Sequence, residues 1–206
     1  MSDNRTASLN AGSGEDLVAV ILPPNWWPIT LGNPQTVKQR IRDITIQRIG
    51  KEDKYAKIRA EIRQNLEQGC TTATDSGYSQ VAVFAMDMAD MSITGSMVTR
   101  MNPSLIGSTV DDVRDTIAKG EPLASVTADT FEDGWIVRSI TQTAIDRKDA
   151  RGNPLLPDLR VEYRVFKDNL PAVAEFVFST PFIPLREALV ELFDSIALSV
   201  HRAIKG

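Results

Sequence analysis

The chain has 206 residues, with 23 Lys and Arg against 27 Asp and Glu, a formal net charge of −4 and 42% hydrophobic residues. This composition excludes a mainly disordered or fibrous chain, and the length favours one generous domain over two small ones. The single cysteine, Cys70, and the single histidine, His201, exclude an internal disulfide framework, a cysteine-based zinc site and a multi-histidine metal site. We therefore expect no metal and no other cofactor.

Residues 1–15 are rich in Ser, Asn, Gly and Ala and lack the basic and apolar regions of a signal peptide. We expect them to form a flexible N-terminal tail, and residues 16–206 to form a single α+β domain. No apolar run approaches the roughly 20 residues that cross a bilayer, so no membrane span is expected. One unpaired thiol suits a reducing compartment, and these features together predict a cytoplasmic protein.

A short apolar run at 17–22 ends at two prolines, and Trp26 and Trp27 follow directly. The prolines disfavour a helix here and favour an extended segment. Because neighbouring side chains of a strand point to opposite faces, we expect one tryptophan in the core and the other in a groove or contact surface. In the alternative, both tryptophans cap the edge of the core.

Apolar residues recur at intervals of three and four in 34–50 and again in 55–69, which predicts a bent helix or a helical hairpin ending at Gly69. Residues 38–63 contain nine basic and four acidic side chains, whereas residues 84–133 contain nine acidic and three basic ones. The basic region is either a docking surface or an ordinary solvated helix face. The opposite charges could also meet by packing within the chain or by head-to-tail self-association.

The rest of the chain reads as strands followed by one helix. The predicted strands are residues 80–88, 92–101, 123–131, 135–145, 159–165 and 172–179. Asp133-Gly134 is a strong hairpin signal, Ser108 is the predicted N-cap of a short helix, and 146–157 is a predicted polar loop. Residues 184–204 predict an amphipathic helix of about five turns. The fold class is thus α+β: one antiparallel meander sheet of about six strands flanked by helices, with a long C-terminal helix.

Catalytic motifs are scarce. A G-x-S-x-G elbow and phosphate-binding glycine loops are absent from the sequence, and His201 is expected on the surface near a helix end. Asp87 and Asp90 lie among methionines, where an apolar environment would raise a carboxyl pKa toward proton transfer. A simple turn is the alternative for this pair.

Two short stretches carry a family resemblance. They are Leu22-Pro23-Pro24-Asn25-Trp26 near the start, and Ser179-Thr180-Pro181 leading into Leu192-Phe193-Asp194-Ser195-Ile196-Ala197. With the order of predicted elements, they resemble PsbP-like α/β proteins, which include actinobacterial lipoproteins and secretion-effector chaperones of related fold. The resemblance implies a binding module whose sheet and helices frame a groove, and it carries over no catalytic residue.

We therefore expect a non-enzymatic, cytoplasmic protein-binding module, chaperone-like or a secretion-associated adaptor, with Trp26, Trp27, Arg59 and Arg63 as contact residues. The expected partner is a protein or a second copy of the chain, not nucleic acid. One alternative is a small-molecule-binding protein or acid/base enzyme that uses Asp87, Tyr163 or Glu175 in a sheet-side cavity. The other alternative is a self-assembling structural subunit.

Overall fold

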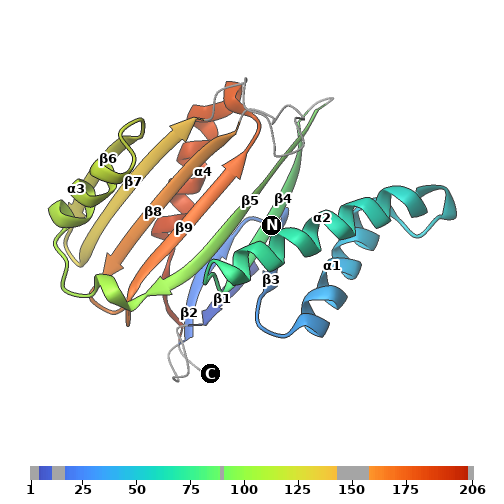
Figure 1. Cartoon of the computed structure of the whole chain (residues 1–206), viewed down its shortest axis with the longest axis horizontal. Coiled ribbons are helices and arrows are strands. Elements are labelled where there is room, and N and C mark those ends of the chain that lie inside the picture. Colours follow the sequence, from blue (N-terminus) through green and yellow to red (C-terminus); the bar gives the residue numbers. More distant parts are fainter. Residues whose placement is uncertain (1–4, 11–16, 89–90, 143–157, 204–206) are drawn as a thin grey trace.

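The computed structural model describes residues 5–10, 17–88, 91–142 and 158–203. Its main feature is a seven-stranded antiparallel sheet in the order β3-β4-β5-β9-β8-β7-β6 (Figure 1). The strands of this sheet are β3 (Trp26–Thr30), β4 (Gln80–Met88), β5 (Met91–Asn102), β6 (Ser125–Phe131), β7 (Gly134–Gln142), β8 (Leu159–Lys167) and β9 (Val173–Thr180). The predicted α+β class is confirmed.

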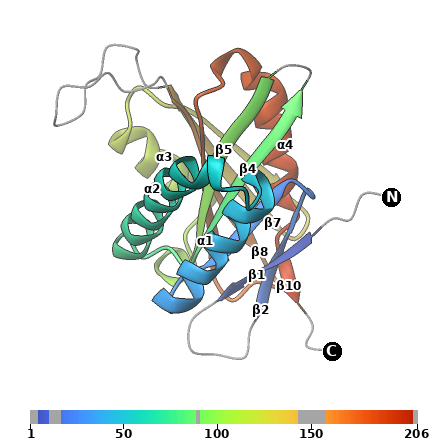
Figure 2. The same ribbon diagram turned by 90° about the vertical axis from the view of Figure 1, so that its right-hand side faces the viewer.

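A second sheet has three strands in the order β1-β2-β10. They are β1 (Arg5–Asn10), β2 (Leu17–Leu22) and β10 (His201–Ala203). The helices are α1 (Pro34–Ile49), α2 (Ala56–Asp75), α3 (Val110–Gly120) and α4 (Arg186–Leu198). Figure 2 shows α1, α2 and α3 on one face of the large sheet, and α4 with the small sheet on the other. Within the described ranges, no helix is both long and apolar enough to cross a bilayer.

The main core lies between the large sheet, α4 and the small sheet. Its centre is aromatic: the rings of Phe178 and Phe193 stack with centroids 4.3 Å apart, and those of Trp26 and Phe84 stack at 4.4 Å. Burying each such side chain contributes about 1.5–3 kcal/mol. The opposite face of the sheet carries two smaller clusters, one under the α1–α2 hairpin and one under α3. The sheet is therefore covered on one face and only partly covered on the other.

The predicted helical hairpin is present, but α2 continues through Gly69 to Asp75. A glycine stops a helix only when the chain takes up a terminating conformation there, and Gly69 does not have a positive φ angle. Asn33 caps α1 as a side-chain acceptor for the N–H groups of Gln35 and Thr36. The N-cap of α3 is one residue later than predicted: it is Thr109, which forms a capping box with Asp112.

Two expectations, about the number of strands and about the N-terminal segment, need correction. The large sheet has seven strands rather than about six, because the tryptophan segment joins its edge as β3. The 1–15 segment, expected to be a flexible tail, contains strand β1, which pairs with β2; residues 1–4 and 11–15 lie outside the described residues. The predicted loop at 146–157 and Asp90 also lie outside them.

The predicted five-turn C-terminal helix ends at Leu198, and β10 follows it. Ser199 breaks the helix: its hydroxyl donates to the carbonyl of Ile196 and accepts the backbone N–H of Ile21 in β2. His201 then pairs with Ala19 of β2. Val200 continues the apolar periodicity and is fully buried in the main core, although it lies after the end of the helix. His201 therefore lies on a strand and not at a helix end.

Candidate functional site

An apolar groove lies between the α1–α2 hairpin and the end of the sheet formed by β3, β4 and β5. We call it the hairpin groove, and its volume is about 450 Å³. Its apolar lining includes Trp27 of β3, Ile44 and Ile49 of α1, Ile62 and Leu66 of α2, and Val83 of β4. The alternation of β3 builds this wall, because Trp27 and Ile29 face the hairpin while Trp26 faces the main core.

Trp27 forms part of the groove wall with its indole 5% exposed. The guanidinium carbon of Arg48 lies 5.2 Å from the centre of the Trp27 ring, a cation–π arrangement. The same guanidinium pairs with the carboxylate of Asp87 at 3.7 Å. These contacts hold the Arg48 guanidinium beside an apolar wall, with the Asp87 carboxylate next to it, so charged groups border the apolar interior of the groove.

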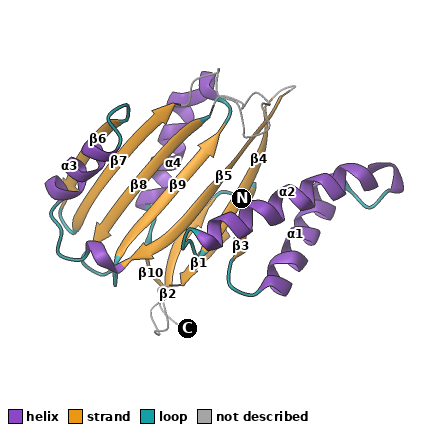
Figure 3. Ribbon diagram, viewed as in Figure 1, coloured by secondary structure: helices purple, strands orange, loops and turns teal. Residues whose placement is uncertain are grey.

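The hairpin extends beyond the edge of the sheet, as Figure 3 shows. On this part of α2, Ile58 is 48% exposed and Ile62 is 36% exposed, one helical turn apart. Exposure of adjacent apolar side chains to water is unfavourable in free energy, and such exposed apolar surface often marks a site that another molecule covers. The groove and the stripe share Ile62, so they form one continuous apolar surface.

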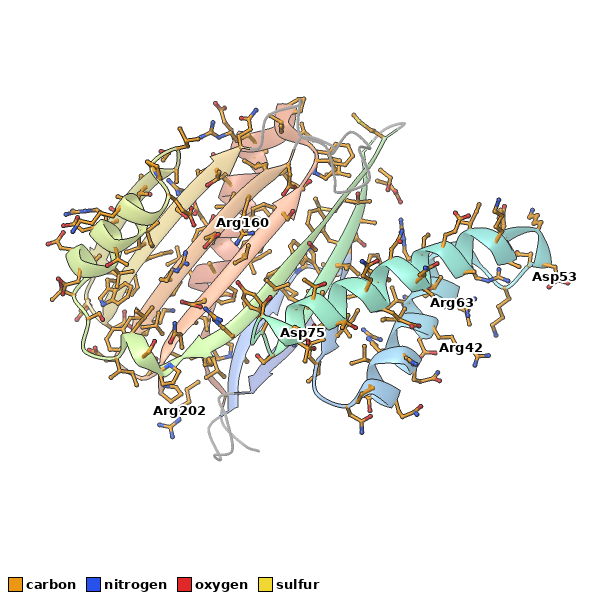
Figure 4. All side chains as sticks on the ribbon, viewed as in Figure 1. Arg42, Asp53, Arg63, Asp75, Arg160 and Arg202 are labelled. Carbon is orange, nitrogen blue, oxygen red and sulfur yellow. The ribbon has the colours of Figure 1, made fainter. Side chains whose placement is uncertain are left out.

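Arg59 and Arg63 were both predicted to contact a partner, and the structure gives them different places. Arg59 is 8% exposed, and its Nη1 donates to the carbonyls of Gly50 and Glu52 at 2.8 Å each. It therefore closes the connection between α1 and α2 from inside. Arg63 donates from Nε to the carbonyl of Arg59 at 3.1 Å and remains partly exposed (Figure 4).

The two tryptophans are separated by the sheet. Trp26 is fully buried between Phe84, Phe178 and Phe193, so a partner arriving from solvent cannot touch it, and its placement as a contact residue needs correction. Both indole N–H groups lack an acceptor within the described part of the chain. Because Trp26 shares this feature, the free indole N–H does not mark Trp27 as a binding residue. The position of Trp27 in the groove wall is what marks it as a binding residue.

A second hollow lies on the same face of the sheet, on the side of α2 toward β8 and β9. We call it the sheet-face cleft, and its volume is about 740 Å³. Figure 1 shows α3 and α2 over the two ends of the sheet, with β8 and β9 between them bare of any helix on this face. The charged residues that line the cleft are Arg100 of β5 and Arg160 of β8, and Tyr78 lies beside them.

Below the cleft, two carboxylates are buried in a network with three arginines. Glu162 accepts from Arg160 at 2.6 Å and from Arg164 at 2.7 Å. Glu175 accepts from Arg100 and, at 2.9 Å, from the side-chain amide of Asn102. Burial opposes ionisation of Glu162, but the charges and hydrogen bonds of its two arginines outweigh it and lower its pKa.

The three residues of the acid/base alternative are not brought together. Glu175 lies on the cleft face, Tyr163 is fully buried on the opposite face of the sheet, and Asp87 is exposed near the end of β4. Burial, together with the negative charge of Asp194, raises the pKa of the Tyr163 phenol. A single cavity lined by these three groups is absent from the described residues. In that part of the chain, no three or more His, Cys, Asp or Glu side chains form a metal-binding group.

The basic hairpin and α3, the helix of the acidic region, lie at opposite ends of the molecule, whereas Asp87 of the acidic region lies beside the hairpin. The hairpin occupies one end of the long axis, and α3 with β6 occupies the other (Figure 1). In α3, Asp111 and Asp115 pair with Arg114 of the same helix. The two regions meet within the chain at one described ion pair, between Arg48 and Asp87 at 3.7 Å, whereas the acidic residues of α3 lie far from the hairpin.

Sequence reasoning missed the cleft, although its main signal was visible. Arg160, Glu162 and Arg164 alternate with apolar residues along β8, which predicted one buried face and one wetter face. What the pattern could not show is that Glu175 and Arg100 lie on neighbouring strands at the same level. The network depends on that register between strands distant in sequence.

Comparison with solved structures finds a likeness to the solution structure of cyanobacterial PsbP (CyanoP) from Synechocystis sp. PCC 6803. The two share 12% sequence identity, with a TM-score of 0.43, over 98% of this chain and 94% of the other. The similarity to a PsbP-like protein that the sequence predicted is thus found again in the structure comparison. No protein-family model and no curated protein matches the chain. A likeness of this size is not informative about ligands, partners or activity.

Proposed function

We propose that the protein is a non-enzymatic protein-binding module, and that its hairpin groove receives an amphipathic, acidic segment of a partner protein. The observation that carries the proposal is the continuous apolar surface formed by the groove and the exposed stripe of Ile58 and Ile62. Apolar surface of this kind, rimmed by charge, is typical of sites that bind another protein. Of the contact residues expected from the sequence, the proposal keeps Trp27. It assigns Trp26 and Arg59 no contact with the partner and assigns that role to Ile58 and Ile62.

The positive charge of the α1–α2 hairpin favours an acidic partner segment. Residues 38–63, which include most of α1 and the start of α2, carry nine basic and four acidic side chains. Arg48 stands at the groove itself, over Trp27. A segment with apolar side chains on one face and Asp or Glu on its flanks would fill the groove and meet this positive field. Such binding weakens as salt is added, because the charged border is exposed to solvent.

The proposal places the module in the cytoplasm, where its single thiol stays reduced. Burial, with a smaller contribution from the charge of Glu67, raises the pKa of the Cys70 thiol to about 11. Cys70 is therefore a protonated, inert core residue near neutral pH and takes no part in partner binding. A chaperone-like or adaptor role agrees with a groove that accepts one extended or helical segment.

Site-specific cross-linking in the native cell tests the proposal. A photo-reactive amino acid placed at Ile58 is expected to capture a partner, and the same group at Ile106, which is 56% exposed outside the hairpin, is the matched control. The cross-linked peptide, identified by mass spectrometry, should be amphipathic and acidic. The additional substitution Ile62→Glu should abolish the adduct, since it puts a carboxylate into the apolar surface.

Three results would contradict the proposal: equal capture at both positions, an adduct that survives Ile62→Glu, and a captured segment that is basic or uniformly polar. Substitution of Trp26 is unsuitable for this test, because a change in the main core affects folding before binding.

A second candidate function, the self-assembling subunit, has one observation in its favour: the basic hairpin and the acidic residues of α3 lie at opposite ends of the long axis. Head-to-tail contact between such ends would build open chains of copies. Sedimentation at two protein concentrations, each in low and moderate salt, decides it. Growth in mass with concentration that disappears in moderate salt supports self-assembly, and a constant monomer mass refutes it.

A further inference from the structure

The sheet-face cleft has polar side chains on both of its facing walls, and Ala73, Val98 and Val177 also line it. A helix packed on a sheet normally presents apolar side chains toward it. Here the part of α2 that lines the cleft presents side chains spaced by three and four residues that are small or polar: Asn65, Gln68, Gly69 and Thr72. The opposite wall is the charged face of β5 and β8, and the space between the two walls is about 740 Å³. This volume is in the range of small-molecule sites.

The charges that border this space are positive. Arg100 and Arg160 line the cleft with side chains 34% and 50% exposed. Glu162 and Glu175 lie beneath them with side chains 5% and 7% exposed. Every oxygen of these two carboxylates accepts from a donor in the chain, and both carboxylates are buried beneath the arginines. A cation therefore finds no free carboxylate on the walls of the cleft.

Arg160 keeps donors for an additional partner. Its Nε is bonded to Glu162, and within the described part of the chain its terminal amino groups have no acceptor. Figure 4 shows Arg160 on the sheet face that the helices leave bare. A guanidinium anchored through Nε and open at its terminal nitrogens is pre-organised to bind the oxygens of a carboxylate or phosphate group.

We infer that the sheet-face cleft is a binding site for a small organic oxyanion, held through its carboxylate or phosphate group by Arg160. Arg100 adds positive charge from the next wall, while its own Nε and Nη1 are held by Glu175 and by the carbonyl of Ser76. The amide and hydroxyl groups of Asn65, Gln68 and Thr72 are available to the polar body of the ligand. This site uses residues other than those of the hairpin groove and does not depend on the proposed function.

Gly69 provides a test that leaves the arginine network intact. A Cβ built at Gly69 meets no atom within 4 Å, and the residue lines the cleft. Gly69→Leu should therefore fold normally and occupy the space of the ligand. Gly120 of α3 also has open space around it and does not line the cleft, so Gly120→Leu is the matched control.

The binding experiment is a titration of the ¹⁵N-labelled chain followed by NMR. Inorganic phosphate and succinate are the probes, added through the millimolar range, with sodium chloride at equal ionic strength as the control for screening. Saturable shifts of the backbone amides of Tyr78 and Arg160 are expected with one or both probes. Tighter binding of phosphate assigns the site to phosphate esters, and tighter binding of succinate assigns it to carboxylates.

Gly69→Leu should weaken the binding about tenfold or more, since a leucine side chain competes for the space of the ligand. Gly120→Leu should bind as the wild type does. Arg160→Gln should also lose binding, and Arg42→Gln, the same change on exposed α1, should retain it (Figure 4). Shifts equal to those in chloride, shifts that do not saturate, or equal binding by both leucine variants would overturn the inference.

Discussion

Arg59→Met tests whether Arg59 is a structural residue of the hairpin rather than a contact for partners. The substitution keeps the apolar stem and removes both bonds from Nη1 to the carbonyls of Gly50 and Glu52. A hydrogen bond to a charged group contributes about 1.5–3 kcal/mol, and water can replace part of the loss because Glu52 is exposed. We expect a loss of about 2–3 kcal/mol in the free energy of unfolding, and a Tm lower by about 4–10 °C.

The matched control is Arg63→Met. Arg63 makes one longer bond, to the carbonyl of Arg59, from a more exposed position, so its loss should change the free energy of unfolding by less than about 0.5 kcal/mol. Urea unfolding followed by circular dichroism measures both variants. Hydrogen exchange should show the amides at the α1–α2 connection losing protection by about 30-fold or more in Arg59→Met alone. Equal stability of the two variants, or unchanged protection at the connection, refutes the reasoning.

Three further predictions concern Glu162 of the ion-pair network, the buried thiol of Cys70 and two glycines. Glu162→Gln should lower the free energy of unfolding by about 2–4 kcal/mol at pH 7, because it removes the buried carboxylate to which Arg160 and Arg164 both donate and leaves Arg164 only its longer pairing with Glu175. Because the pKa of Glu162 is lower in the folded chain, its ionised carboxylate stabilises the fold at pH values above the ordinary glutamate pKa, and this stabilisation disappears as the pH falls through the folded-state pKa. Urea unfolding at pH 7 and pH 3 should therefore show a smaller difference in the free energy of unfolding between Glu162→Gln and the wild type at pH 3. A difference that does not change with pH contradicts the assignment. Cys70, with its thiol pKa raised to about 11, should react with a thiol reagent at pH 8 only after unfolding in urea, and rapid labelling of the native chain would disprove its burial. Gly69→Ala replaces a glycine in a helix interior and should raise the free energy of unfolding by about 0.5–1 kcal/mol. Gly134→Ala should lower it by more than about 2 kcal/mol, because the added Cβ would meet the carbonyl oxygen of Phe166. Thermal melts in which Gly134→Ala is the more stable variant would refute this prediction.

Local signals predicted the elements well where a signal and its consequence lie close together in the chain. The hairpin between β6 and β7 forms at the predicted place, with Glu132 and Asp133 in the turn and Gly134 paired to Phe131 as the first residue of β7, because a tight turn is decided by nearby residues. The stripe that begins at Pro34 forms α1, since helix periodicity and capping involve neighbours within one turn. The C-terminal helix was predicted too long, because Ser199 ends it through a bond to Ile21, which is distant in sequence.

The candidate sites followed the same division. The sequence predicted that one of Trp26 and Trp27 lies in the core and the other at a groove or contact surface, and it predicted a wetter face on β8, both from the alternation of side chains along a strand. It could not show whether Arg59 faces solvent or the α1–α2 connection, because the sequence pattern of a charged helix residue is the same in both cases. Trp26 and Trp27 were equally plausible as contact residues until the helices on each face were known.

The sequence by itself determined the fold class, the strands of the meander, the helical hairpin and the separation of charge along the chain, because periodicity, turn residues and composition are local properties. Only the tertiary structure decided where those charges lie and what they do. It brought Arg100, Arg160, Arg164, Glu162 and Glu175 into one network through the register of three strands. It also left the space between α2 and that network open, and a void between surfaces depends on how whole elements pack, which no single stretch of sequence encodes.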